Sequence, residues 1–257
     1  MPAVAALLER RPALLALRRA FPRSPVRILT ARSPAHLERL LDRHLVDALV
    51  LGSEAIRGQV LDALRRDYPA LPILAYLQVR SDDAELLLRA RRERVAGVAM
   101  EGIDEAVLPR LVGEHSLTAR RTADLLPLGP ALRLTDELQG RAWQIIVADS
   151  PSGLDTATLA RRLGVARETL SRRFAAGGAP PLKRAIDAVR LVAAAQLLGN
   201  PAYQVADAAR LVGFSSPSLL QRTARRTFGV SAREVASVDH GALTRTLLGD
   251  TGARDWT

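Results

Sequence analysis

The same short pattern occurs twice between residues 155 and 235, and this repeat constrains the fold more than any other feature. In the first copy Gly164 follows Ala160 by four residues, and in the second Gly213 follows Ala209 by the same distance. A small residue lets two helices approach closely, and a glycine lets the chain leave a helix sharply. The repeat therefore predicts two helix-turn-helix units, each with its glycine in the turn.

The two copies continue into a second helix each. Leu170 and Leu220 occupy matching places, but at an offset one residue larger, which indicates one extra residue in the second turn. We expect these leucines to face inward, leaving Arg172 and Arg222 on the outer faces of helices at about 167–176 and 217–227. A serine, Ser215 or Ser216, can cap the later helix, with Pro217 in its first turn. The units span about 155–176 and 204–228.

A long helix is expected between the two units. Apolar residues recur at helical spacing from Pro181 to Gly199, between a proline start and a glycine stop. At 1.5 Å per residue this helix measures roughly 28 Å, close to the turn of B-DNA at roughly 34 Å. Such a helix could hold two recognition helices for successive segments of the major groove.

With these motifs in place, the C-terminal part resembles the AraC/XylS family of bacterial transcription regulators. The resemblance covers roughly residues 131 to 235 and implies a helical module that reads adjacent major-groove turns as a monomeric unit. The residues that carry it are Arg190–Leu191, Val205, Ala209, Gly213 to Ser216, Arg222 and Phe228–Gly229.

The resemblance also implies which side chains meet DNA. By motif position, the base-reading residues are Glu168, Ser171 and Arg172 in the first recognition helix and Ser218, Gln221 and Arg222 in the second. Arginines beside them resemble phosphate contacts, namely Arg167, Arg173, Arg225 and Arg226.

Short apolar runs alternate with amphipathic helices from Val26 to Leu117. Strands are expected at 26–30, 48–51, 71–77 and 95–100, and helices from Ser33–Pro34 to about His44, at 56–68, from Ser81–Asp83 to about Arg94, and at 104–117. Buried runs that alternate with helices indicate a parallel sheet covered on both faces. The fold class is thus a small doubly wound α/β domain of about four strands, followed by an all-α domain.

The segment before this sheet, Val4 to Ala20, is expected to be an amphipathic helix that Pro12 divides. It either packs on its own domain or binds a partner. The boundary between the domains is expected at 125–130, where two prolines and a glycine cannot continue a helix. This gives domains of 1–126 and 127–257.

The N-terminal domain resembles a degenerate response-regulator receiver. A phosphorylated receiver needs an aspartate at a strand end, acidic residues after the first strand for Mg²⁺, a Ser/Thr and a lysine. Those places are read here as Gly52, the 30–32 stretch, the Leu77 region and Glu101. The first unit also looks too short, as if part of the standard fold were missing. The resemblance implies a pseudo-receiver without phosphorylation chemistry, used for dimerisation or ligand sensing.

Composition favours a polyanionic partner. The chain of 257 residues has a formal charge of +10, and thirteen Lys/Arg against five Asp/Glu between residues 155 and 235 place +8 of it in the repeat. Cysteine is absent from the sequence, which excludes disulfides, thiolate catalysis and Cys-based zinc sites. The four histidines are scattered, so we expect no catalytic or metal site and no cofactor. No apolar stretch reaches transmembrane length, so we expect a cytoplasmic protein without a membrane partner.

These observations predict a regulator of transcription that is not an enzyme and binds double-stranded DNA. Homodimerisation through the N-terminal domain, RNA polymerase and a small-molecule effector are further candidate interactions. Gly52–Ser53, at a strand end, is a candidate effector site because open α/β sheets bind ligands there. The alternative is a small-molecule-sensing α/β protein whose helical half serves protein–protein interaction.

Overall fold

The computed structural model describes residues 3–21, 26–79, 83–238 and 240–248. It divides into two compact units. Unit 1 comprises Met1–Arg120 with Gly199–Ala202, and unit 2 comprises Arg121–Leu198 with Tyr203–Thr257. Among the described residues, no helix is both long enough and apolar enough to cross a bilayer.

Unit 1 is built on one parallel sheet of five strands in the order β2-β1-β3-β4-β5. All residues of β1, β3 and β4 are buried, as expected for strands covered on both faces. The strands are β1 (Ala3–Leu7), β2 (Arg27–Ala31), β3 (Ala48–Leu51), β4 (Ile73–Leu77) and β5 (Gly97–Met100).

The predicted helix from Val4 to Ala20 is wrong in its first half. Ala3–Leu7 forms β1, a central strand paired with both β2 and β3, and the helix α1 begins only at Arg11, with Pro12 in its first turn. Alanine favours a helix in isolation, but full burial between two strands overrides that preference. The sheet therefore has five strands instead of about four, and no unit of the doubly wound pattern is missing.

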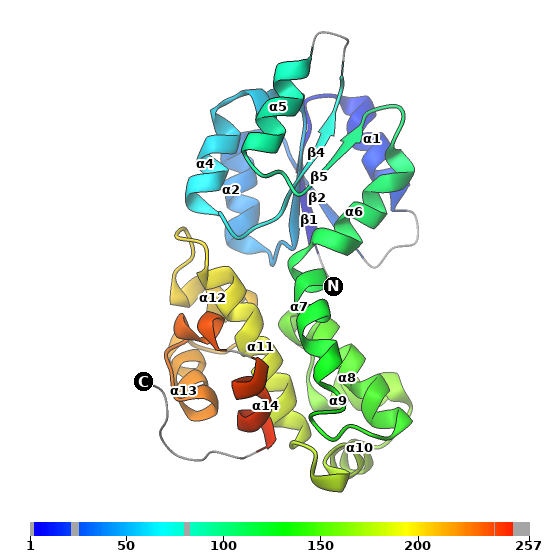
Figure 1. Cartoon of the computed structure of the whole chain (residues 1–257), viewed down its shortest axis with the longest axis vertical. Helices are drawn as coiled ribbons and strands as arrows, with labels where there is room; N and C mark the ends of the chain where they lie inside the picture. The colour runs from blue at the N-terminus through cyan, green and yellow to red at the C-terminus, as the bar shows by residue number, and fades with distance from the viewer. Residues whose placement is uncertain (1–2, 22–25, 80–82, 239, 249–257) are drawn as a thin grey trace. The chain divides into compact units, whose positions relative to one another are not determined.

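Helices cover both faces of this sheet (Figure 1). Val4 and Ala6 point to the face covered by α1 and α6, where they join a core that includes Leu17, Leu108 and Val112. The alternate strand residues point to the face of α2, α4 and α5. The α/β fold class predicted for this part is confirmed.

The helices of unit 1 differ from prediction mainly at their boundaries. The segment predicted as one helix at 56–68 is divided at Gly58, and that at 104–117 contains a 3₁₀ turn, Glu105–Val107. Of the predicted start at 81–83, Ser81 and Asp82 lie outside the described residues. The helices are α1 (Arg11–Ala20), α2 (Pro34–Arg43), α3 (Ser53–Arg57), α4 (Gln59–Asp67), α5 (Ala84–Arg92), α6 (Leu108–His115) and α7 (Leu117–Leu125), of which α7 contains the boundary between the units.

Unit 2 is helical throughout its regular structure, which confirms the all-α class predicted for it. Its central helix α11, Leu182–Leu198, is the expected long helix and is buried at twelve of its seventeen positions, so it forms the core. The other helices are α8 (Glu137–Asp149), α9 (Thr156–Leu163), α10 (Arg167–Phe174), α12 (Val205–Leu211), α13 (Pro217–Phe228) and α14 (His240–Leu248).

Candidate nucleic-acid interface

The first helix-turn-helix unit consists of α9 and α10. Asp155 caps α9 by accepting a hydrogen bond from the Thr158 N–H at 2.7 Å. Gly164 ends the helix in the left-handed region, at φ 69°, which an alanine adopts only with strain. Ala160 is buried against the next helix, and Leu170 and Phe174 of α10 are fully buried. The expected turn and inward face are both present.

The second unit, α12 and α13, has the same construction with one residue more between its glycine and its second helix. Gly213 lies at φ 79°, and the Ser216 hydroxyl accepts from the Leu219 N–H at 3.1 Å, with Pro217 opening α13. Ala209 and Leu220 are buried as their counterparts in the first unit are. Of the two serines proposed as the cap, the structure selects Ser216.

The residues predicted to read bases lie along the outer sides of α10 and α13. Glu168, Arg172, Ser218 and Arg222 are exposed, whereas Ser171 and Gln221 are half-buried. The Gln221 carboxamide oxygen accepts a hydrogen bond from the Ala232 N–H at 3.2 Å. Gln221 is therefore partly a structural residue that fixes the segment after α13.

The four arginines predicted to contact phosphate are all exposed, but three have acidic neighbours. Arg167 lies 3.2 Å from Glu168, Arg173 lies 3.2 Å from Asp136, and Arg226 lies 3.9 Å from the nearly buried Asp187. The pairs of Arg167 and Arg173 have both partners exposed and are weak, so these two arginines can exchange them for phosphate at small cost. Arg225 has no ion pair among the described residues.

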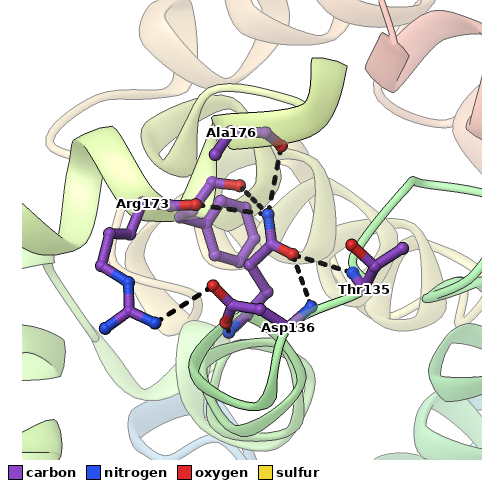
Figure 2. Close-up of polar contacts among 6 residues, drawn as sticks. Thr135, Asp136, Arg173 and Ala176 are labelled. Atoms are coloured by element: carbon purple, nitrogen blue, oxygen red, sulfur yellow. Dashed lines mark hydrogen bonds and ion pairs between the residues drawn. The ribbon is translucent and has the colours of Figure 1, made fainter.

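Gln139 holds the end of the first recognition helix, and sequence reasoning missed this role. Its carboxamide nitrogen donates to the carbonyl oxygens of Arg173, Phe174 and Ala176 at 3.2, 3.0 and 3.2 Å (Figure 2). Its oxygen accepts from the backbone N–H groups of Thr135 and Asp136. The side chain is buried, so it satisfies carbonyls at the end of α10 that water cannot reach.

Asp136 also connects the start of α8 with the end of α10. It accepts from the Gln139 N–H at 2.8 Å and forms a capping box with Gln139, while its other oxygen meets Arg173. The backbone hydrogen bond, and then Arg173, lower the pKa of the Asp136 carboxyl below its ordinary value. The helix α8 therefore begins at Glu137, directly after this cap. The Asp-x-x-Gln spacing is a capping signal that could have located this start.

Arg190 on α11 joins the two helix-turn-helix units. Its guanidinium lies 5.6 Å from the centroid of the Phe214 ring, in the second turn, and its Nη2 donates to the carbonyl oxygen of Leu154, just before α9, at 2.9 Å. Burial lowers the pKa of Arg190 from its ordinary value. The backbones of the two regions also lie close together: a Cβ built on Gly213 would lie 3.5 Å from the Cα of Gly153.

Charged side chains with polar partners lie at the carboxyl edge of the sheet in unit 1. Because β1 is Ala3–Leu7, the place after the first strand is Leu8 to Arg10, and the assignment of that place to 30–32 is wrong. It contains one acid, Glu9, which accepts from the Ala55 N–H at 3.0 Å. A Cβ on Gly52 would overlap the Glu9 carboxylate. A phosphorylated receiver has acids after its first strand and a lysine after its fifth. Here the base Arg10 follows β1 and the acid Glu101 follows β5, and the two side chains pair at 2.9 Å.

Among the described residues, no group of three or more His, Asp or Glu side chains is arranged to hold a metal ion. The predicted effector position, Gly52–Ser53, lies at this same edge. The Ser53 hydroxyl bonds there with the backbone of Gln78, accepting from its N–H at 3.0 Å.

Comparison with known proteins gives one family match, to the helix-turn-helix domain over residues 159–237. No curated protein gives a significant match. Among solved structures, the chain is similar to the signal receiver domain of an HD domain-containing protein from Pseudomonas fluorescens Pf-5, with 17% identity over 44% of this chain and 93% of that one and a TM-score of 0.40. Full-length FixJ from B. japonicum is 12% identical over 87% and 95% of the two chains, with a TM-score of 0.39.

A third similar structure is RcsB from Salmonella enterica serovar Typhimurium bound to the promoter rprA, with 14% identity over 67% of this chain and 88% of that one and a TM-score of 0.39. The family match covers most of both units of the repeat, including α10 and α13. Residues 159–237 thus match the helix-turn-helix domain family, which confirms the module that the repeat predicted and supports a DNA-binding transcription regulator.

Proposed function

We propose that this protein is a sequence-specific transcription regulator that reads two successive major-groove segments of duplex DNA with α10 and α13. The observation that carries the proposal is the matching position of Arg172 and Arg222, exposed on two helices whose opposite faces are buried in one helical unit. The α11 helix between the units, with seventeen residues at 1.5 Å each, is about 26 Å long, near the pitch of B-DNA at roughly 34 Å.

The side chains divide into two roles. Arg172 and Arg222 suit bidentate contact with guanine, and Glu168, Ser171, Ser218 and Gln221 supply further contacts to base edges. Phosphate contacts, which position the module without reading sequence, come from Arg167, Arg173, Arg225 and Arg226. The carboxamide oxygen of Gln221 is not part of this reading surface, because it accepts a hydrogen bond from the Ala232 N–H.

We infer two domains with separate roles: the domain at 1–126 controls DNA binding, and the domain at 127–257 binds the DNA. The N-terminal domain controls the module without phosphorylation, by forming a homodimer or by binding a small molecule in the cytoplasm. The absence of an acceptor carboxylate at Gly52, with Glu9 beside it, supports that view. RNA polymerase is a further proposed partner.

The test is binding of the full chain to random genomic duplex over a series of salt concentrations, with sequencing of the retained DNA. We expect a steep salt dependence, because arginines that neutralise phosphates release counterions. We also expect an enriched motif that spans two major-groove turns. Absence of DNA binding at low salt would contradict the proposal and favour the alternative, a helical half that binds protein.

A further inference from the structure

A cavity of unit 1 lies over the carboxyl ends of β1 and β2, and Glu9 is part of its lining. Its volume is about 610 Å³, within the range of roughly 300–1,000 Å³ typical of small-molecule sites. Leu8, Leu14 and Val60 give it an apolar lining. Open α/β sheets bind ligands at this edge, where the connections leave the strands.

The acidic groups around this cavity are already occupied. Glu9 accepts from the Ala55 N–H at 3.0 Å, and Glu54 pairs with Arg57 at 3.2 Å. Arg10, which also lines the cavity, pairs with Glu101 at 2.9 Å. These contacts leave no carboxylate of the lining directed at the other arginines.

Three arginines of the lining therefore have no ion-pair partner among the described residues. The Arg11 and Arg32 guanidinium groups have no hydrogen bond or ion pair to any described residue. Within the part of the chain that the structure describes, the Arg18 guanidinium donates only to the neutral Thr30 hydroxyl, at 3.3 Å. Three like charges around one apolar cavity repel one another until an anion joins them.

We propose that this cavity is a binding site for a small organic anion, such as a carboxylate or phosphate monoester, with an apolar body. The anionic group lies against Arg11, Arg18 and Arg32, and the body packs on Leu8, Leu14 and Val60. The site differs from the phosphorylation place of a receiver, which would lie at Gly52. The inference rests on the proposed function only in giving unit 1 the role of a ligand-sensing domain.

The test uses the full chain and calorimetric titration, with 2-naphthoate as the probe. Naphthalene-2-methanol keeps the apolar body without the charge, and inorganic phosphate keeps the charge without the body. We expect 2-naphthoate to bind at least about tenfold more tightly than either, because both parts of the site contribute. The double variant Arg11→Gln/Arg32→Gln should weaken naphthoate binding by about tenfold or more. Arg39→Gln, an exposed change on α2 outside the cavity lining, is the matched control and should bind as the unchanged chain does.

Equal binding of the neutral alcohol, equal binding of inorganic phosphate, or unchanged naphthoate binding in the double variant would each overturn the proposal, as would absence of naphthoate binding. Duplex binding is measured separately on the same preparation, without the probe. A failure of DNA binding would contradict the proposed function and leave the ligand result intact. A failure of ligand binding would leave the DNA-binding proposal intact.

Discussion

The guanidinium of Arg190 lies over the ring of Phe214, 5.6 Å from its centroid, while its Nη2 donates to the Leu154 carbonyl oxygen. One side chain of α11 thus contacts the approach to the first helix-turn-helix unit and the turn of the second. This contact holds the two helix-turn-helix units in a fixed relative position. The proposed binding of two successive major-groove segments requires that.

Replacing Arg190 with Met should lower the free energy of unfolding by about 2 kcal/mol, through loss of the cation–π contact and of hydrogen bonds to partly buried carbonyls. DNA affinity should fall as well, since the recognition helices lose their fixed spacing. Denaturant titration and a duplex-binding assay measure the two effects. Arg210→Met is the control and should change stability little, because this exposed position on α12 forms an ion pair with Asp207, three residues away.

Gln139→Ala should destabilise unit 2 by about 2 kcal/mol, because three carbonyl oxygens at the end of α10 lose their donor. The control is Gln144→Ala, an exposed position on the same helix α8. Thermal unfolding of both variants measures the difference. Equal melting temperatures would mean that water replaces Gln139 without cost.

Arg172→Ala and Arg222→Ala should each relax sequence preference at one base position, at a cost of roughly 1–3 kcal/mol on the preferred duplex. Arg225→Ala should instead weaken binding to all sequences alike and reduce the salt slope by about one. Affinities on the selected duplex and on single-base variants measure these effects. Equal losses on every sequence for all three variants would contradict the assignment of base readers.

Acidification should destabilise the helical unit through its capping carboxylates. Backbone hydrogen bonds lower the pKa of Asp136 and Asp155 in the folded state below the ordinary value of 3.8. The stability that they contribute is therefore present above that value and lost as the pH falls below it through the folded-state pKa. Unfolding free energy measured from pH 5 downward should decline, and Asp155→Ala should reduce the decline.

Incubation with acetyl phosphate and Mg²⁺ should leave the mass of the protein unchanged, because Gly52 offers no acceptor and Glu9 is held by the Ala55 N–H. Mass spectrometry of the intact chain is the measurement. A phosphoryl adduct on any carboxylate at this edge would refute control without phosphorylation.

The repeat could be found from sequence because its geometry dictates residue type. Gly164 and Gly213 have left-handed backbones that other residues adopt only with strain, so the turns are visible in the sequence itself. Ala160 and Ala209 are buried where two helices meet, so a small residue recurs at the matching position of each copy.

The first strand could not be found in this way. In Ala3–Leu7 every residue but Val4 lacks β-branching, and there is no alternation, because both faces of the strand are buried. Its conformation follows from pairing with β2 and β3, which lie far along the chain. With β2 taken as the first strand, the place after it falls at 30–32, and only the pairing of β1 puts Glu9 beside Gly52.

The contacts of Gln139 and Arg190 likewise depend on tertiary structure. Gln139 meets carbonyls 34 to 37 residues away, and Arg190 meets Leu154 across 36 residues. Neither spacing corresponds to a local pattern such as a cap or a helix turn. These residues position the site without belonging to its surface, and only packing shows them.

The most direct test of the central claim compares the selected duplex with the same duplex carrying about five extra base pairs, half a helical turn, between its two half-sites. Because one helical unit holds α10 and α13, we expect the insertion to reduce affinity to the level of random duplex. Unchanged affinity would contradict the claim that both helices read DNA together.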